Sequence, residues 1–235
     1  DVHEQLYAFN NTPTGTLRIG SSSTMAQNVL AGMTADMLKE YPGLTVNLVT
    51  GIPAPDLIAD GLDLVIRVGT LQDSSLFSRK LGAMPMVVCA AKSYLVQYDA
   101  PEKPADLANH TWLTYSVRPD NEFELIAPEG ISTRLTPEGR FITNDPMTLT
   151  RWISAGAGIA YVPLMWVIDQ VNRGELEILL PRYQSDPRPV YALYTEKDKL
   201  PLKVQVCINY LTEYFVKVAK LYQDMRGHSG SLVEG

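Results

Sequence analysis

Strand-like apolar segments alternate along the chain with segments in which apolar residues recur at helical spacing. Residues 16–19 are strand-like, residues 25–40 carry an apolar side chain at every fourth position from Met25 to Met37, and residues 44–49 are strand-like again. A Tyr-Pro-Gly sequence ends the helical segment. A helix between two such strands predicts a βαβ unit with parallel strands.

The rest of the chain continues this alternation as far as a last amphipathic helix. Residues 62–68 are apolar almost throughout, as expected for a strand of a parallel sheet covered on both faces. Between residues 104 and 142 the pattern changes to short β segments separated by Pro, Gly and Asn. The further predicted strands are residues 85–90, 112–116, 123–127, 131–135, 140–143, 159–162, 176–180 and 190–194, and the further predicted helices are residues 57–61, 146–155, one that starts at Pro163 and one over 204–222.

This order of elements predicts an α/β fold, and two breaks in the pattern predict two lobes. The breaks lie near residues 85–92 and 187–189, which suits a chain that leaves one lobe, builds a second and returns. The expected boundaries are residues 1–15 for the end of a linker helix or linker, 16–87 plus 190–222 for lobe I, 88–189 for lobe II and 223–235 for a tail.

Composition narrows the class of protein. The 235 residues are 46% hydrophobic and 20% charged, which is typical of a globular protein with a sizeable core. A net charge of −6 argues against this chain gripping a nucleic-acid backbone by itself, because such binding needs a basic surface. The sequence shows neither the run of roughly 18 apolar residues that spans a bilayer nor a signal-peptide pattern, so no membrane partner is expected.

Two cysteines, Cys89 and Cys207, both lie in apolar segments. Buried structural thiols are therefore favoured, with redox sensing as the alternative, and no disulfide framework is indicated. This cysteine usage favours a reducing cytoplasm. The chain starts at Asp1 rather than at Met, so we expect either a processed protein or a fragment of a longer one.

A run of four hydroxyl residues, Ser21 to Thr24, directly follows the first predicted strand. A serine nucleophile needs a positioned base and an orienting third group, but His3, His110 and His228 lie in terminal segments or a predicted loop. Thr24 also stands where the G-x-S-x-G motif has its second glycine. The spacings of His, Cys and acidic residues that bind metals are absent. A Gly-Ala-Gly sequence at residues 156–158 precedes a strand, whereas the glycine-rich loop of a dinucleotide-binding site follows one. The sequence therefore predicts no enzymatic activity, no metal and no cofactor.

The hydroxyl run is better placed for binding. In parallel α/β sheets, ligands lie beyond the carboxyl ends of the strands and near helix N-termini, where free N–H groups and the helix dipole favour an anion. One of Ser22, Ser23 and Thr24 is expected to cap the following helix, which leaves the other hydroxyls for a ligand. Capping alone is the alternative interpretation.

Eight segments of the chain stand in an order that is typical of one protein family. The segments are GTLRIGSSST (15–24), KEYPGLTVNLVTG (39–51), DGLDLVIRVG (60–69), LFSRKLGAMPMVVCAAKSYL (76–95), PEKPADLANHTWLTY (101–115), ITNDPMTLTRWISAGAGIAYVPLMWV (142–167), GELEILLPRY (174–183) and LPLKVQVCINYLTEYF (200–215). With them the chain resembles the C-terminal effector-binding domain of LysR-type transcriptional regulators. The resemblance implies two Rossmann-like lobes joined by two crossover strands, as in periplasmic binding proteins, with a small molecule in the inter-lobe cleft.

Position by position, the resemblance also implies a set of effector contacts. Arg67 is expected to hold an anionic effector, such as a carboxylate or an aromatic acid, because its guanidinium can bind a carboxylate bidentately. The alternatives are that Arg67 pairs with Asp63, and that Asn144 and Asp145 only cap the helix that starts at Pro146. The implied contacts are Ser22, Ser23, Thr24, Arg67 and Gly69 in the first lobe, and Asn144, Asp145, Pro146, Met147, Tyr161 and Pro163 in the second.

The function implied by the resemblance is effector sensing and oligomerisation in a cytoplasmic bacterial regulator. Effector binding would change the angle between lobes or the packing in a homodimer or homotetramer, with the helix at residues 25–40 in the interface. DNA would be contacted only through an N-terminal helix-turn-helix that this sequence lacks. The main alternative is a solute-binding protein of a transport system, and a hydrolase that uses Ser22 or Ser23 is a distant third.

Overall fold

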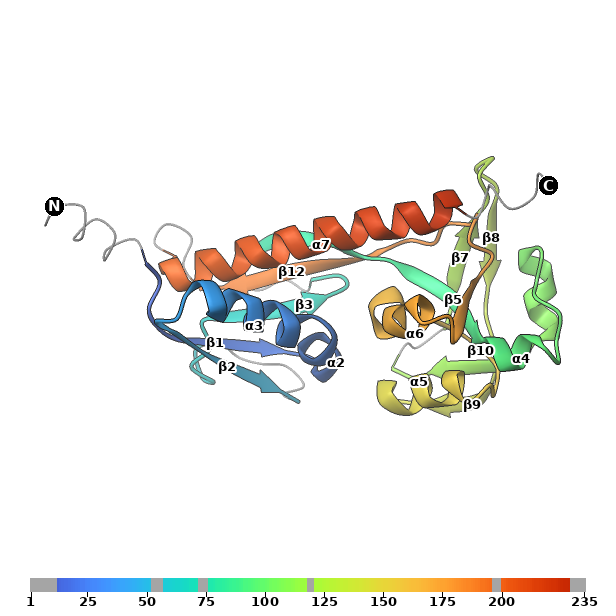
Figure 1. Ribbon diagram of the computed structural model, residues 1–235, viewed down its shortest axis with the longest axis horizontal. Helices are drawn as coiled ribbons and strands as arrows, with labels where there is room; N and C mark the ends of the chain where they lie inside the picture. The colour runs from blue at the N-terminus through green and yellow to red at the C-terminus, as the bar shows by residue number, and fades with distance from the viewer. Residues whose placement is uncertain (1–11, 52–56, 72–75, 118–120, 196–199, 229–235) are drawn as a thin grey trace, which may run out of the picture. The chain divides into compact units, whose positions relative to one another are not determined.

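The computed structural model describes residues 12–51, 57–71, 76–117, 121–195 and 200–228, and it divides the chain into two compact units (Figure 1). Unit 1 takes its residues from Asp1–Ala83 and Pro189–Val218, and unit 2 from Met84–Arg188 and Ala219–Gly235. The chain therefore passes between the units three times. Our sequence boundaries put the first passage four residues later, at 87/88, and assigned the whole of 190–222 to lobe I.

Unit 1 is built on a five-stranded sheet whose first strands confirm the predicted βαβ unit. β1 is parallel to β2 and to β3, whereas β12 runs antiparallel to β3. Strand β4 was not predicted, because its first four residues are all exposed and lack an apolar alternation. In spatial order the strands are β2 (Leu44–Thr50), β1 (Gly15–Ser21), β3 (Leu64–Val68), β12 (Arg188–Tyr194) and β4 (Phe77–Met84).

The helix predicted at residues 25–40 is present but is not regular. It consists of α2 (Ser23–Met25), a π-helical turn at Ala26–Leu30 and α3 (Ala31–Glu40). In the π-helical turn the N–H of Ala31 donates to the carbonyl of Ala26, one residue further back than in an α-helix. The apolar face inferred from the spacing is confirmed, since its four members are buried: Met25, Val29, Met33 and Met37.

The short helix predicted at residues 57–61 is instead a turn. The N–H of Leu62 donates to the carbonyl of Leu57 at 2.8 Å, and Gly61 adopts a φ of +60°. The left-handed conformation of Gly61 ends the segment after a single turn, so the prediction of a helix was wrong. The turn places Leu57 and Leu62 in a small core with Val65.

Unit 2 contains a second five-stranded sheet and a separate hairpin. β6 is parallel to β9 and β10, whereas β5 is antiparallel to β10 and β11, so the sheet is mixed. In spatial order its strands are β11 (Leu176–Leu179), β5 (Met86–Ala91), β10 (Ile159–Pro163), β6 (Trp112–Tyr115) and β9 (Gly139–Thr143). The hairpin pairs β7 (Phe123–Ile126) with β8 (Ser132–Leu135), which confirms the predicted run of short strands.

Short helices complete unit 2. The predicted helix at residues 146–155 is confirmed as α5. The helix predicted to start at Pro163 is instead a 3₁₀ turn from Leu164, followed by an α-helix from Ile168, because Pro163 is the last residue of β10. The helices are α4 (Lys92–Leu95), α5 (Pro146–Ser154) and α6 (Ile168–Asn172), with 3₁₀ turns at Pro104–Asn109 and Leu164–Trp166.

The two faces of the unit 2 sheet belong to different cores, and β10 shows this best. Ala160 and Val162 pack on one face with Leu149 and Ile153 of α5. Their neighbours Ile159 and Tyr161 pack on the opposite face, against the β7–β8 hairpin. The period of two along the strand therefore decides which core each side chain enters.

The last helix, α7 (Leu202–His228), is longer than predicted. It continues through residues 223–228, which the sequence analysis assigned to the tail. The predicted apolar face is confirmed over residues 204–215 by five buried side chains: Val204, Cys207, Ile208, Leu211 and Phe215.

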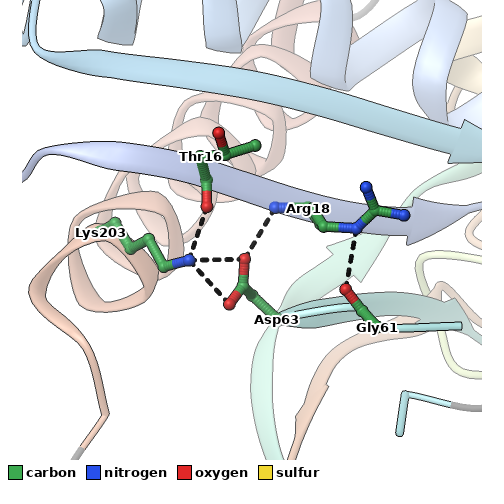
Figure 2. A network of polar contacts seen from close by, with 5 residues as sticks. All are labelled: Thr16, Arg18, Gly61, Asp63 and Lys203. Carbon is green, nitrogen blue, oxygen red and sulfur yellow. Dashed lines mark hydrogen bonds and ion pairs between the residues drawn. The ribbon is translucent and has the colours of Figure 1, made fainter. Parts of the chain in front are cut away.

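A polar network ties the start of α7 to the sheet of unit 1 (Figure 2). The ammonium of Lys203 lies 2.8 Å from both carboxylate oxygens of Asp63 and donates to the carbonyl of Thr16 at 2.6 Å. Asp63 also accepts from the backbone N–H of Arg18 at 2.8 Å, and the Arg18 side chain donates to the carbonyl of Gly61. These backbone contacts therefore hold the partly buried Lys203–Asp63 ion pair in one position.

Candidate functional site

The five predicted contacts of lobe I lie at one edge of the unit 1 sheet. Because β1 and β3 are parallel, with Gly20 opposite Val65, their carboxyl ends meet at the same edge. Ser22–Thr24 follow the end of β1, while Arg67 and Gly69 stand at the end of β3. The sheet topology thus brings hydroxyl groups and a guanidinium to the edge where α/β sheets bind ligands.

Within the hydroxyl run, one residue caps the helix and one is free. Ser22 is the N-cap of α2: its Oγ accepts from the N–H of Met25 at 3.3 Å and lies 3.2 Å from the hydroxyl of Thr24. The buried Ser21 hydroxyl donates to the carbonyl of Ser22. Ser23 is exposed, and its hydroxyl makes no hydrogen bond within the described residues. Capping therefore consumes Ser22 and leaves Ser23 available.

Arg67 is half-buried, and its guanidinium forms no ion pair or hydrogen bond within the described part of the chain. The alternative that it pairs with Asp63 was wrong, since that carboxylate binds Lys203 and the backbone of Arg18. Gly69 adopts a φ of +95° and donates its N–H to the carbonyl of Pro189, so this N–H is already used by the fold. Arg67 is thus the side chain at this edge with an uncommitted positive charge.

The predicted contacts at the start of α5 also divide into structural and free groups. Asp145 is the N-cap, with its carboxylate accepting from the N–H of Thr148 at 2.7 Å, and hydrogen bonds from Thr148 hold the pKa of Asp145 below its usual value. Pro146 occupies the first helical position, and Met147 is half exposed. Asn144 is exposed, and its amide has no hydrogen-bond partner among the described residues.

Tyr161 and Pro163 lie on β10, among the cores of unit 2. The Tyr161 ring stacks on Phe123 with centroids 3.9 Å apart, on the face of the sheet opposite α5. Pro163 is buried. Tyr115 was not among the predicted contacts, and it ends β6 opposite Thr143. Burial and the nearby Asp145 carboxylate raise the pKa of Tyr115. Its position at the carboxyl end of a parallel strand was the signal that could have found it.

Other kinds of site find no support in the described residues. No group of three His, Cys, Asp or Glu side chains within them could hold a metal ion. None of the helices described is both long and apolar enough to cross a membrane. Burial raises the pKa of Cys89 and of Cys207 to about 12, so neither thiol is a thiolate at neutral pH.

Comparison with known proteins decides the family. A family model described as the LysR substrate binding domain matches residues 10–216. The chain belongs to the LysR family. It is the effector-binding domain of a LysR-type transcriptional regulator, with the two-lobed α/β architecture of that family. A solute-binding protein of a transport system is not favoured.

Curated relatives and solved structures of LysR-type regulators agree with this assignment. The chain is 86% identical over 227 residues to the HTH-type transcriptional activator AaeR of Escherichia coli K12, a match that covers 97% of this chain and 74% of the relative. The regulatory domain of CrgA from Neisseria meningitidis is 26% identical, with a TM-score of 0.74 and coverage of 86% and 100%. Full-length AphB of Vibrio cholerae is 26% identical, with a TM-score of 0.71 and coverage of 91% and 76%.

Proposed function

We propose that this LysR-type domain senses a small anionic effector, a carboxylate or an aromatic acid, through the edge of unit 1 that carries Ser23 and Arg67. The observation that supports this most directly is the half-buried Arg67 guanidinium, which has no counter-ion within the described residues. A planar guanidinium without a counter-ion can bind a carboxylate through two hydrogen bonds, and the neighbouring hydroxyls of Ser23 and Thr24 supply further hydrogen bonds.

In unit 2 we propose Asn144, Met147 and Tyr115 as the further contacts. Asn144 offers an uncommitted amide, and Met147 offers an exposed apolar surface. Asp145, Tyr161 and Pro163, which the resemblance also implied, then act through the fold, as a helix cap, an aromatic stack and a buried strand end. An ionised Asp145 would repel an anionic effector if it touched one, which supports a capping role.

The regulator as a whole is proposed to be a cytoplasmic homo-oligomer without enzymatic activity that binds DNA through a helix-turn-helix. We propose activation as its mode of control, because the relative with 86% identity is named a transcriptional activator. An effector changes such a regulator only if its affinity differs between two arrangements of the protein.

A thermal-shift titration with benzoate tests the anion site. A true effector analogue raises the melting temperature by mass action. Arg67→Gln and Ser23→Ala are expected to reduce the shift, and Arg67→Gln to abolish most of it. Arg79→Gln and Ser78→Ala on the exposed part of β4 are matched controls that keep it.

Ser23 is preferred to Ser22 for this test because Ser22→Ala would also remove the cap of α2. A benzoate shift that survives Arg67→Gln and Ser23→Ala would contradict the proposed site. A reporter gene driven by the regulator's own promoter tests the mode of control, and activation predicts higher expression in the presence of effector.

A further inference from the structure

A pocket of about 430 Å³ lies within unit 2. It lies along β11, the edge strand of the sheet, and beside β5 and the last turns of α7. The candidate contacts Asn144 and Met147 follow β9, which is the opposite edge strand of the same sheet. No residue that the sequence analysis assigned to the effector lines this pocket.

Most of the residues that line the pocket are apolar. They include Met86 and Val88 of β5, Leu125 of the hairpin, Leu179 of β11 and Met225 of α7. A volume of this size falls within the range of roughly 300–1,000 Å³ that is usual for small-molecule sites. An apolar ligand body would therefore fit the interior by both size and chemistry.

Two cationic side chains line the same pocket, and neither forms an ion pair within the described residues. Lys92 is exposed. Arg226 is held by the carbonyls of Pro181 and Arg182, each at 3.3 Å, and by the side-chain oxygen of Gln184 in the amide orientation that satisfies both groups. These neutral acceptors fix the position of the Arg226 guanidinium without cancelling its charge. The lining includes one carboxylate, the exposed Glu177, so the cations outnumber it.

Tyr222 adds a hydrogen-bond donor. Its ring lies 5.7 Å from the guanidinium carbon of Arg226, and its hydroxyl makes no hydrogen bond within the described part of the chain. Burial raises the pKa of Tyr222, an effect that Arg226 partly opposes, so the phenol stays protonated at neutral pH and can donate. A half-buried phenol without an acceptor is well suited to a carboxylate ligand.

We propose that this pocket is a second ligand site, which binds a small amphipathic anion by its apolar body and its carboxylate. The apolar walls take the body, while Arg226 and Tyr222, which lie next to each other, face the charged end. The site is independent of the effector site proposed above, because none of the candidate effector contacts belongs to it.

Isothermal titration calorimetry with octanoate, and with octanamide as its neutral analogue, tests the proposal. Octanoate is expected to bind the wild-type chain more tightly than octanamide does. Arg226→Gln is expected to weaken octanoate binding by about two- to tenfold, because it removes the positive charge beside Tyr222. Tyr222→Phe keeps the ring but removes the donor, and is expected to weaken binding by about two- to tenfold.

A blocking variant and a matched control complete the experiment. Ala100 is exposed and lines the pocket, so Ala100→Trp fills the pocket without altering the core and is expected to abolish binding. Lys220→Met removes an exposed lysine of α7 that does not line the pocket, and is expected to leave binding unchanged. Undetectable octanoate binding, or binding that persists in Ala100→Trp, would overturn the proposal.

The two proposed sites can be tested independently of each other. Arg67→Gln should leave octanoate binding intact, and Ala100→Trp should leave the benzoate shift intact. If Arg67→Gln alone removed octanoate binding, the pocket proposal would be wrong while the effector site stood. If Ala100→Trp alone removed the benzoate shift, the effector site at Arg67 would be wrong and the pocket would be supported.

Discussion

Two glycines of unit 1 have contrasting surroundings. A Cβ added to Gly82, on β4, would lie 2.5 Å from the Cβ of Phe215 on α7. A Cβ added to Gly32, in α3, would meet no atom within 4 Å apart from the backbone of its own helix. The contact between β4 and α7 thus depends on the missing side chain of Gly82, whereas Gly32 only costs the helix conformational entropy.

Substitution of these glycines by alanine should therefore change stability in opposite directions. Gly82→Ala is expected to lower the free energy of unfolding by about 1–3 kcal/mol, because strand and helix must move apart. Gly32→Ala is expected to raise it by about 0.5–1 kcal/mol through helix propensity. Urea denaturation followed by circular dichroism measures both, and a loss of stability in both variants would contradict this account.

Single residues also show where sequence reasoning ends. The hydroxyl run and the position of Arg67 were visible in the sequence, but which serine caps the helix depends on the extended backbone of Ser22, with φ −67° and ψ 153°. The counter-ion of Asp63 proved to be Lys203, 140 positions away, so no local pattern could have excluded Arg67 as its partner. Long-range pairing of this kind is a property of the fold.

At the scale of elements, the Asp63–Lys203 pair joins the beginning of β3 to the beginning of α7. Both side chains are partly buried, at 24% and 21% exposure, and each has a further backbone partner in β1. Such a pair is worth more than an exposed one, because three elements hold its geometry and solvent screening is reduced.

Removal of either partner should destabilise unit 1. Lys203→Met is expected to lower the free energy of unfolding by about 1–2 kcal/mol, since the Asp63 carboxylate loses its counter-ion. Lys220→Met, elsewhere on the same helix, is the control and should change stability little. A double-mutant cycle with Asp63→Asn isolates the coupling, and a coupling energy near zero would show that the pair is incidental.

Most elements were predictable because their apolar periods are clear, and the failures have identifiable physical causes. The buried face from Met25 to Met37 and the strands of the unit 2 sheet followed from spacing alone. β4 was missed because its exposed first half carries no alternation. The π-helical turn at Ala26–Leu30 keeps the apolar spacing, so the pattern of a regular α-helix conceals it.

At the scale of the whole molecule, each compact unit contains one buried cysteine. Cys207 belongs to unit 1 and Cys89 to unit 2, and both side chains are fully buried. Burial raises the pKa of each thiol to about 12, so labelling by a thiol reagent requires that the surrounding unit opens. The two cysteines therefore report separately on the opening of the two units.

Labelling of single-cysteine variants should reveal how far a change in one unit affects the other. Gly82→Ala weakens packing in unit 1, so in the Cys89→Ser background it should speed labelling of Cys207, by about tenfold for each 1.4 kcal/mol lost. In the Cys207→Ser background it should speed labelling of Cys89 less, because Cys89 lies in the core of unit 2. Both rates should rise with pH, since the opened thiol ionises near its ordinary pKa of about 8.5. Equal acceleration at both cysteines would instead mean that the two units open as one cooperative body.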